Sequence, residues 1–454
     1  MTAVRLTEQL GSFVSALKAN NTPPLARRRA IEGFIDCFGV MTAGADEPAA
    51  QVVRRLASRE DGDSGTWPDA LLTSSCAAAL VNGTAAHALD YDDTGLKGHP
   101  SAVLVPAILA TAEEIGASGA SMVTAYLAGY ETWAELIFRE QDQHPTKGWH
   151  ITGIFGAIAA AAACASIREL DAASTVTALS IAASQSSGLL ANFGTMVKPL
   201  HAGLAARAGV FSAELAAAGL SASPDAFEHP QGFLAAVSPA GRFDITSPVR
   251  AGREWRMLSI GLNVKKYPMC YCTHRPIDGA LNLRAKQSIN ARDIDSIVVS
   301  MSARNATILR HHAPKTVLEA KFSIEFAMAA AFIAGAVGIR EVADGFVQRP
   351  DVQEFFRRVS AGNVVASDPV TGHGVYDKVD VRLANGKIIS SGEVEVARGA
   401  ASLPISDEET FLKFEDCLAA SKYQLHAKKL FAMLSDLDGL DLVRDLYADS
   451  DIVT

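Results

Sequence analysis

Residues 265–274, KKYPMCYCTH, mark the point at which the amino-acid sequence changes character. Before this stretch the chain is rich in alanine, the best helix former, and its apolar residues recur at helical spacing. After it, β-branched residues alternate with polar ones, as is typical of strands. The stretch therefore predicts a boundary between a helical domain and a smaller domain that contains a sheet.

The chain before this boundary predicts one large helical bundle. Gly and Pro stand mainly where one helix would give way to the next. The small side chains favour close packing of helices, and no repeat of fixed length is evident, so a bundle is expected rather than a solenoid. The expected helices cover 25–43, 47–59, 68–88, 101–115, 119–138, 152–167, 170–189 and 202–219.

A β-hairpin is the clearest element after the boundary. The alternating runs 378–383 and 387–397 are separated by Ala384-Asn385-Gly386, and Asn-Gly between two such runs is a strong hairpin signal. The other elements expected in this region are a strand at 295–301 and helices at 274–287, 318–336 and 350–359.

The sequence returns to helical patterns near its end, at 407–421 and 422–437. We therefore expect a mainly α protein. A large all-α helical-bundle domain, discontinuous in sequence, would comprise 1–266 and 401–454, with a smaller α+β domain inserted at 267–400. Ligands commonly bind in clefts between domains, so the site is expected there.

The overall composition is that of a compact globular protein. Of the 454 residues, 49% are hydrophobic and 20% are charged, which allows a large core. The net charge of −9 has the wrong sign for a chain devoted to nucleic acid. The N-terminus lacks a signal-peptide pattern, and the apolar runs at 153–167 and 326–339 are too short to span a membrane. Six scattered cysteines make no disulfide framework, so we expect a cytoplasmic protein. Because of the net charge and the short apolar runs, we expect neither nucleic acid nor a membrane as a partner.

The first candidate site is the string HALDYDDT at 87–94, followed by His99. It lies between two expected helices, so its carboxylates stand near a helix N-terminus, where anions bind readily. The carboxylates of Asp90, Asp92 and Asp93, together with His99, are suited to acid–base chemistry or to holding a divalent cation. Alternatively, Asp92 or Asp93 only caps a turn.

Two further candidates stand at the starts of helices. His150 precedes a long helix of small residues and suits a proton donor or a carboxylate binder. Lys198 is followed by Pro199 and a helix, so its ammonium is expected beside a helix N-terminus, which also attracts anions. The alternatives are a structural histidine and an exposed, solvated lysine.

The boundary stretch itself offers lysines and His274 to a cleft that needs positive charge. Its Cys270-x-Cys272-x-His274 pattern is that of half a zinc site, but no second pair of ligands at zinc-like spacing follows, so zinc is not expected. The sequence also lacks the glycine-rich motifs of nucleotide-binding folds and the GxSxG and HExxH motifs of hydrolases.

A series of strings stands in order along nearly the whole chain: HALDYDDT (87–94), HPSAVLVPAILATAE (99–113), GWHITGIFGAIAAAAA (148–163), KPLHAGLAARAG (198–209), VKKYPMCYCTH (264–274) and LEAKFSIEFAMAAA (318–331). Together they resemble the MmgE/PrpD family, which includes 2-methylcitrate dehydratase, cis-aconitate decarboxylase and iminodisuccinate epimerase. The resemblance implies a large discontinuous all-α domain, a smaller α+β domain and a homodimer. It also implies a small anionic polycarboxylate as substrate, and neither a metal nor an organic cofactor.

The resemblance further implies which residues form the site. The site residues of the decarboxylase fall on Asp90, Thr94, His99, His150, Lys198 and His274. Reactions of the family pass through carbanion-like or enolate-like centres beside a carboxylate, so they need cations for carboxylates and positioned acids and bases. We expect Asp90 with His99 to abstract or orient a proton, and His150 to donate one. Binding of the substrate is expected from Lys198, His274, Thr94 and Lys266.

Two departures from the decarboxylase bear on the reaction. The loop from Thr94 to His99 is one residue shorter, and Phe326 stands where the decarboxylase has a tyrosine. A missing hydroxyl removes a proton donor or a carboxylate contact. We therefore expect a cofactor-independent lyase of the 2-methylcitrate dehydratase type, with an epimerase of an iminodisuccinate-like acid or a cis-aconitate-type decarboxylase as alternatives. From other classes, a metal-dependent enzyme and a non-catalytic polycarboxylate-binding protein are the rivals.

Overall fold

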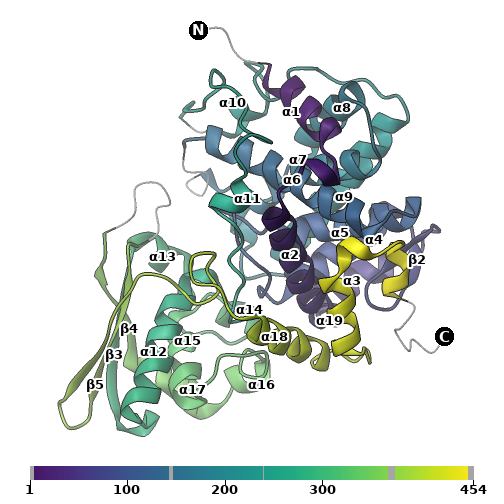
Figure 1. Cartoon of the computed structure of the whole chain (residues 1–454). Helices are drawn as coiled ribbons and strands as arrows, with labels where there is room; N and C mark the ends of the chain where they lie inside the picture. Colours follow the sequence, from purple (N-terminus) through teal and green to yellow (C-terminus); the bar gives the residue numbers. More distant parts are fainter. Residues whose placement is uncertain (1–4, 143–146, 239, 367–373, 448–454) are drawn as a thin grey trace. The chain divides into compact units, whose positions relative to one another are not determined.

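The computed structural model describes residues 5–142, 147–238, 240–366 and 374–447. The chain forms two compact units, Met1–Leu262 with Glu408–Thr454 (unit 1) and Asn263–Asp407 (unit 2). Unit 2 interrupts unit 1 in the sequence, and it is the one that contains the larger sheet (Figure 1). This confirms the expected fold class, a mainly α protein with a smaller α+β part.

Unit 1 is a bundle of helices with one short hairpin, whose first strand is buried. Its helices are α1 (Leu6–Ala16), α2 (Pro24–Gly44), α3 (Pro48–Ala57), α4 (Ser75–Ala88), α5 (Ser101–Ile115), α6 (Gly119–Arg139), α7 (Ile151–Ile167), α8 (Ala172–Gln185), α9 (Val197–Ala217), α10 (Phe233–Val237), α11 (Arg256–Ser259), α18 (Asp407–Ala419) and α19 (Ala427–Ser435). The hairpin pairs β1 (Ser64–Thr66) with β2 (Leu71–Thr73) in antiparallel fashion.

Small residues let the central helices approach closely. A Cβ atom on Gly83 of α4 would lie 2.8 Å from the Cα of Gly203 in α9, so any larger residue there would push the two helices apart. In α7, every residue from Ile151 to Ala165 is buried. The contact between α4 and α9 matters for function, because α4 ends at the string HALDYDDT and α9 begins beside Lys198.

The helix expected at 68–88 begins later, at Ser75, and this part of the prediction was wrong. The Ser74 hydroxyl accepts a hydrogen bond from the Ala77 amide and caps the first turn. The preceding residues form the β1–β2 hairpin instead. The side-chain amide of Asn82 holds that hairpin against α4 by accepting from the Trp67 amide at 2.8 Å and donating to the Gly65 carbonyl at 3.2 Å.

Unit 2 has a four-stranded sheet in the order β4-β3-β5-β6. The strands are β3 (Ile294–Met301), β4 (Val359–Val364), β5 (Asp377–Leu383) and β6 (Ile388–Val394). β3 and β4 are parallel, whereas β3–β5 and β5–β6 are antiparallel. The predicted Asn-Gly hairpin is confirmed, with Gly386 at φ +83° in its turn. Strand β4 was missed, because helix was expected up to residue 359.

Helices α12 (His274–Gln287) and α15 (Ile324–Ile333) pack against this sheet and against each other (Figure 1). Val379 and Val381 of β5 are fully buried in the core that these elements share, and Phe326 of α15 belongs to the same core. The remaining helices of the unit are short: α13 (Ala303–Ile308), α14 (Val317–Ala320), α16 (Asp344–Val347) and α17 (Pro350–Phe355).

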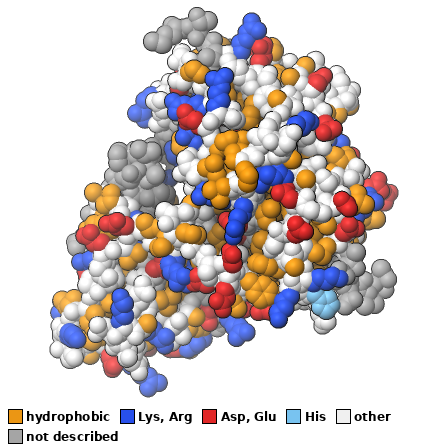
Figure 2. Space-filling view, in the orientation of Figure 1, with side chains coloured by type: hydrophobic (Ala, Val, Ile, Leu, Met, Phe, Trp, Pro, Cys, Tyr) orange, Lys and Arg blue, Asp and Glu red, His pale blue; other side chains and the backbone are white. Residues whose placement is uncertain are grey.

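Two surface properties follow from the described residues. No helix among them is long and apolar enough to cross a bilayer. On the face drawn in Figure 2, acidic and basic side chains are interspersed, and Lys and Arg form no continuous stripe there. Proteins that bind nucleic acid through its phosphates usually gather such residues on one face.

Candidate active site

The string HALDYDDT places its acidic residues on the loop between α4 and α5. His87 lies in the last turn of α4, and the loop runs from residue 89 to residue 100. Asp90 adopts a left-handed backbone with φ +53°, which aspartate tolerates better than most residues. Asp93 stabilises the start of α5 from the loop: its carboxylate accepts from both the amide and the hydroxyl of Ser101, the first residue of that helix.

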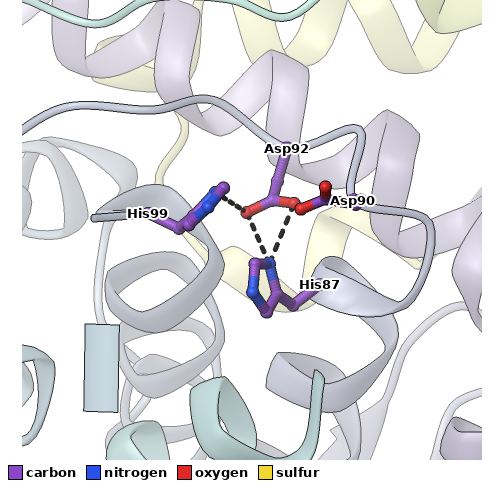
Figure 3. Close-up of side chains that lie close together, drawn as sticks. All are labelled: His87, Asp90, Asp92 and His99. Atoms are coloured by element: carbon purple, nitrogen blue, oxygen red, sulfur yellow. Dashed lines mark hydrogen bonds and ion pairs between the residues drawn. The ribbon is translucent and has the colours of Figure 1, made fainter. Parts of the chain in front are cut away.

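Asp92 lies between two histidines and is fully buried (Figure 3). The Nδ1 atom of His87 lies 2.9 Å from Asp92 Oδ2 and 3.0 Å from Oδ1. The Nδ1 atom of His99 lies 2.9 Å from the same Oδ2, and 3.0 Å from the carbonyl oxygen of Asp93. One carboxylate therefore orients both imidazoles.

Lys198 brings a buried ammonium group to this cluster from the first turn of α9. Its Nζ atom lies 2.6 Å from Asp90 Oδ1 and 3.0 Å from His87 Nε2, and the residue is 5% exposed. The alternative interpretation, an exposed and solvated lysine, is therefore wrong. Helix α9 begins at Val197, one turn before the sequence indicated, and Pro199 fits in this first turn because the amide there needs no partner within the helix.

His150, just before α7, faces the same cluster. Its ring lies 6.0 Å from that of His87 and 4.9 Å from that of Phe193, between centroids. Its Nδ1 atom lies 3.0 Å from Nδ1 of His201, which is three residues after Lys198 on α9. The predicted residues Asp90, His99, His150 and Lys198 thus belong to one network of contacts within unit 1. Thr94 is half-buried on the same loop.

Burial and neighbouring groups determine the charges in the network. Burial alone would raise the pKa of Asp92, but the adjacent imidazoles outweigh it and hold that pKa well below its usual range. Burial lowers the pKa of His87 to about 3, against the opposing effect of Asp92. Burial, followed by His87 and Lys198, lowers the pKa of His150 well below its usual range. Near neutral pH, Asp92 is therefore ionised, and both His87 and His150 are neutral.

One set of residues in this site has the composition of a metal centre. His87, Asp90, Asp92 and His99 each offer a ligand atom, and these atoms lie within 4.8 Å of one another. Asp93 is not in the set, because its carboxylate binds Ser101. The ammonium of Lys198, however, already contacts two of the four residues, His87 and Asp90. The Lys198 ammonium thus supplies, at His87 and Asp90, the positive charge that a bound metal ion would otherwise supply.

Residues 265–274 belong to unit 2. His274 is fully buried at the start of α12, between the rings of Tyr267 and Tyr271, at centroid distances of 5.1 and 4.9 Å. Among the described residues, Cys270, Cys272 and His274 do not converge as metal ligands. Phe326 is buried beside Phe346, with the ring centroids 6.2 Å apart.

Comparison with known proteins explains this combination of fold and site. The model of the MmgE/PrpD N-terminal domain matches residues 8–246, and that of the MmgE/PrpD C-terminal domain matches residues 267–436. The chain belongs to the MmgE/PrpD family. It is an enzyme of this family, and its sequence is similar to those of several named enzymes.

These relatives are named for one reaction. The cis-aconitate decarboxylase of Mus musculus is 24% identical over 452 residues, which cover 96% of this chain and 91% of that protein. The human cis-aconitate decarboxylase is 25% identical over 426 residues, covering 90% and 87%. The Aspergillus terreus cis-aconitate decarboxylase is 24% identical over 393 residues, covering 80% and 79%.

Three participants in the network were not predicted as site residues from the sequence: His87, His201 and Phe193. His201 could have been found, because residues three apart on a helix share a face and Lys198 was already a candidate. His87 stands in the quoted string, but only the fold shows that its two ring nitrogens face Asp92 and Lys198. Asp92 was considered for acid–base chemistry, as a metal ligand or as a cap, whereas in the structure it orients two histidines.

Proposed function

We propose that this MmgE/PrpD enzyme is a cofactor-independent lyase that acts on a small di- or tricarboxylate by proton transfer next to a carboxylate. The observation that carries the proposal is the buried Lys198 ammonium, which stands among neutral imidazoles and two ordered aspartates. Such a site can bind a carboxylate group and move protons without a metal ion.

His99 is the best-placed general base. Its Nδ1 atom faces two acceptors, the Asp92 carboxylate and the Asp93 carbonyl, so Nδ1 carries the proton. When the ring carries no second proton, its Nε2 atom has the lone pair that can accept a proton from substrate. The side chain of His99 is 14% exposed, more than that of His87 or Asp92, which fits a group that meets the substrate.

Lys198 is proposed to bind a substrate carboxylate, with Asp90 holding the ammonium in place at 2.6 Å. The sequence left Asp90 either to abstract or to orient a proton, and its bond to Lys198 supports the orienting role. His150 is proposed as the proton donor. It is neutral without substrate, and a polyanionic ligand would raise its pKa and so allow it to take up the proton that it delivers.

The direction of electron flow distinguishes the candidate reactions. In a dehydration, the base takes the proton beside a carboxylate and the neighbouring carbon loses hydroxide, which leaves as water with a proton from the acid. In a decarboxylation, carbon dioxide leaves and the carbon that keeps the electron pair takes up a proton. In an epimerisation, the same carbon loses and regains its proton. His99 and His150 could serve all three.

The relatives favour decarboxylation of a cis-aconitate-like acid, because those covering most of this chain are named for that reaction. Phe326 supports the second candidate, dehydration of the 2-methylcitrate type, because its buried ring has no hydroxyl to offer. His274, Lys266 and Thr94 are further proposed substrate contacts. A homodimer, implied by the family resemblance, and a cytoplasmic location, expected from the cysteine usage, are also proposed.

Proton NMR in deuterated water tests the proposal. The purified, chelator-treated enzyme is incubated with citrate, 2-methylcitrate, cis-aconitate and iminodisuccinate stereoisomers. A new alkene from a hydroxy acid, or an acid shortened by carbon dioxide, identifies a lyase and its substrate. Deuterium entry at an otherwise unchanged stereocentre identifies an epimerase instead. Binding without turnover, seen as thermal stabilisation by these acids alone, would indicate a binding protein and contradict the proposal.

A further inference from the structure

The hydrogen-bond directions around Asp92 can be assigned from geometry. Asp92 is fully buried, and its carboxylate meets the Nδ1 atoms of both His87 and His99 within 3.0 Å. An ionised carboxylate can only accept hydrogen bonds. Each imidazole must therefore place a proton on Nδ1. If either ring carried its proton on Nε2 alone, a bare nitrogen lone pair would face a carboxylate oxygen.

The same assignment determines what His87 presents to Lys198. With its proton on Nδ1, the neutral His87 ring has an acceptor at Nε2, 3.0 Å from Lys198 Nζ. The lysine ammonium, which has only donors, can then donate to His87 Nε2 and to Asp90 Oδ1 together. A His87 ring with its proton on Nε2 would instead oppose one donor with another and push the ammonium away.

We propose that Asp92 and His87 are positioning residues, in which one carboxylate sets the tautomers of two histidines and thereby places both the base and the carboxylate-binding ammonium. Asp92 orients His99 directly and holds Lys198 through His87. Neither Asp92 nor His87 needs to touch the substrate. The kinetic part of this inference rests on the proposed roles of His99 and Lys198, whereas the tautomers are a property of the enzyme without substrate.

The tautomers can be measured on the intact enzyme labelled with ¹⁵N-histidine. Long-range ¹H–¹⁵N correlation spectra distinguish a protonated Nδ1 from a protonated Nε2, and His87→Phe and His99→Gln assign the two rings. We expect both rings to carry the proton on Nδ1, the less populated tautomer of free histidine in water. A proton on Nε2 alone in His87 would overturn the inference, whether or not any acid is turned over.

Asp92→Asn tests the cause of these tautomers. Both Asp92 oxygens lie within 3.0 Å of His87 Nδ1, so in either orientation the asparagine presents its NH₂ group to that nitrogen and favours the Nε2 tautomer of His87. His99 keeps the Asp93 carbonyl as an acceptor for its Nδ1 proton. The matched control is Asp93→Asn, in the neighbouring buried aspartate that binds Ser101. We expect His87 to change tautomer in Asp92→Asn and neither ring to change in Asp93→Asn.

The kinetic readout uses the substrate found in the NMR panel. Asp92→Asn is expected to lower kcat/KM about 100-fold, because the altered His87 ring opposes the Lys198 ammonium and the His99 ring loses its charged orienting partner. His87→Phe keeps a ring but removes the acceptor for Lys198, so it is expected mainly to raise KM. Unchanged tautomers in a folded Asp92→Asn enzyme, or kinetics of both variants within about threefold of wild type, would overturn the inference. If Asp92→Asn does not fold, the wild-type tautomers and His87→Phe decide it.

Discussion

The ammonium of Lys413 lies 2.9 Å from the carbonyl oxygen of Tyr91, the residue between Asp90 and Asp92. It also lies 2.5 Å from Asp36 Oδ1 and 4.1 Å from the centre of the Tyr91 ring. Lys413 belongs to α18, the helix that follows unit 2 in the sequence, and it is 7% exposed. The C-terminal segment therefore holds the backbone of the candidate active-site loop.

Lys413→Met should both destabilise the enzyme and impair it. The change leaves Asp36 buried without its cation, which typically costs about 3–5 kcal/mol, less if Asp36 becomes protonated. The freed Tyr91 carbonyl should let the loop shift, so we expect kcat/KM to fall about tenfold or more. Urea unfolding and steady-state kinetics measure the two effects.

The matched control for this variant is Lys422→Met. Lys422 also pairs with an aspartate, Asp46, and also lies over an aromatic ring, that of Tyr423, but its side chain is 58% exposed. An exposed pair of this kind contributes at most about 1 kcal/mol. Equal losses of stability in the two variants would contradict the anchoring role of Lys413.

Substitution of Lys198 and His150 should affect different kinetic parameters. Lys198→Ala removes the proposed carboxylate-binding charge, and the loss of a buried charged hydrogen bond should raise KM about 100-fold. His150→Ala removes the proposed acid and should mainly lower kcat, by about 100-fold or more. Exposed Lys428→Ala serves as a control for the loss of a lysine. A lower kcat in Lys198→Ala together with a higher KM in His150→Ala would disprove the roles assigned to these two residues.

Binding of a polycarboxylate should be accompanied by proton uptake. Burial and the surrounding His87, Lys198, His201 and His99 hold the pKa of His150 well below its usual range in the free enzyme. An added polyanion raises that pKa, so the complex binds more protons than the free enzyme between the two pKa values. Affinity should therefore fall as pH rises through the pKa of the complex.

Isothermal titration calorimetry at pH 6.5 in buffers of different ionisation enthalpy measures this uptake. A competitive, unreactive polycarboxylate avoids heat from turnover. We expect uptake in the wild type and a smaller value in His150→Asn. Proton release on binding, or uptake unchanged by His150→Asn, would contradict the assignment of His150.

Removal of metal ions should leave the activity intact. The Lys198 ammonium contacts Asp90 and His87, two of the four residues that could otherwise hold a cation. Activity after exhaustive chelation should equal that before treatment, and added Mg²⁺, Mn²⁺ or Zn²⁺ should not raise it. Loss of activity on chelation that one of these ions restores would favour a metal-dependent enzyme.

Local patterns in the sequence were sufficient to predict the fold class. Helical spacing and alanine content indicated α5 and α7 to within a residue at each end, and Asn385-Gly386 indicated the β5–β6 hairpin. Strand β4 was missed because it follows directly on a short helix and contains Gly362. The helical spacing and the strand alternation of apolar residues are therefore both too short here to be recognised.

The candidate site could be predicted only in part. Asp90, His99, His150 and Lys198 stand in strings typical of the family, and the structure places them in one network. The sequence did not reveal which ring nitrogen of each histidine faces which hydrogen-bond partner. That orientation depends on the close approach of α4 and α9 at Gly83 and Gly203. Hydrogen-bond partners from different helices cannot be deduced from spacing along the chain.

The central claim, that this cluster performs proton transfer on a polycarboxylate, is tested most directly by kcat of His99→Gln on the substrate found in the NMR panel. The glutamine is uncharged and can accept a hydrogen bond, but it cannot act as a base near neutral pH. Our account predicts a folded enzyme with KM within about threefold of wild type and kcat lower by about 100-fold or more. A kcat equal to that of the wild type would contradict the account.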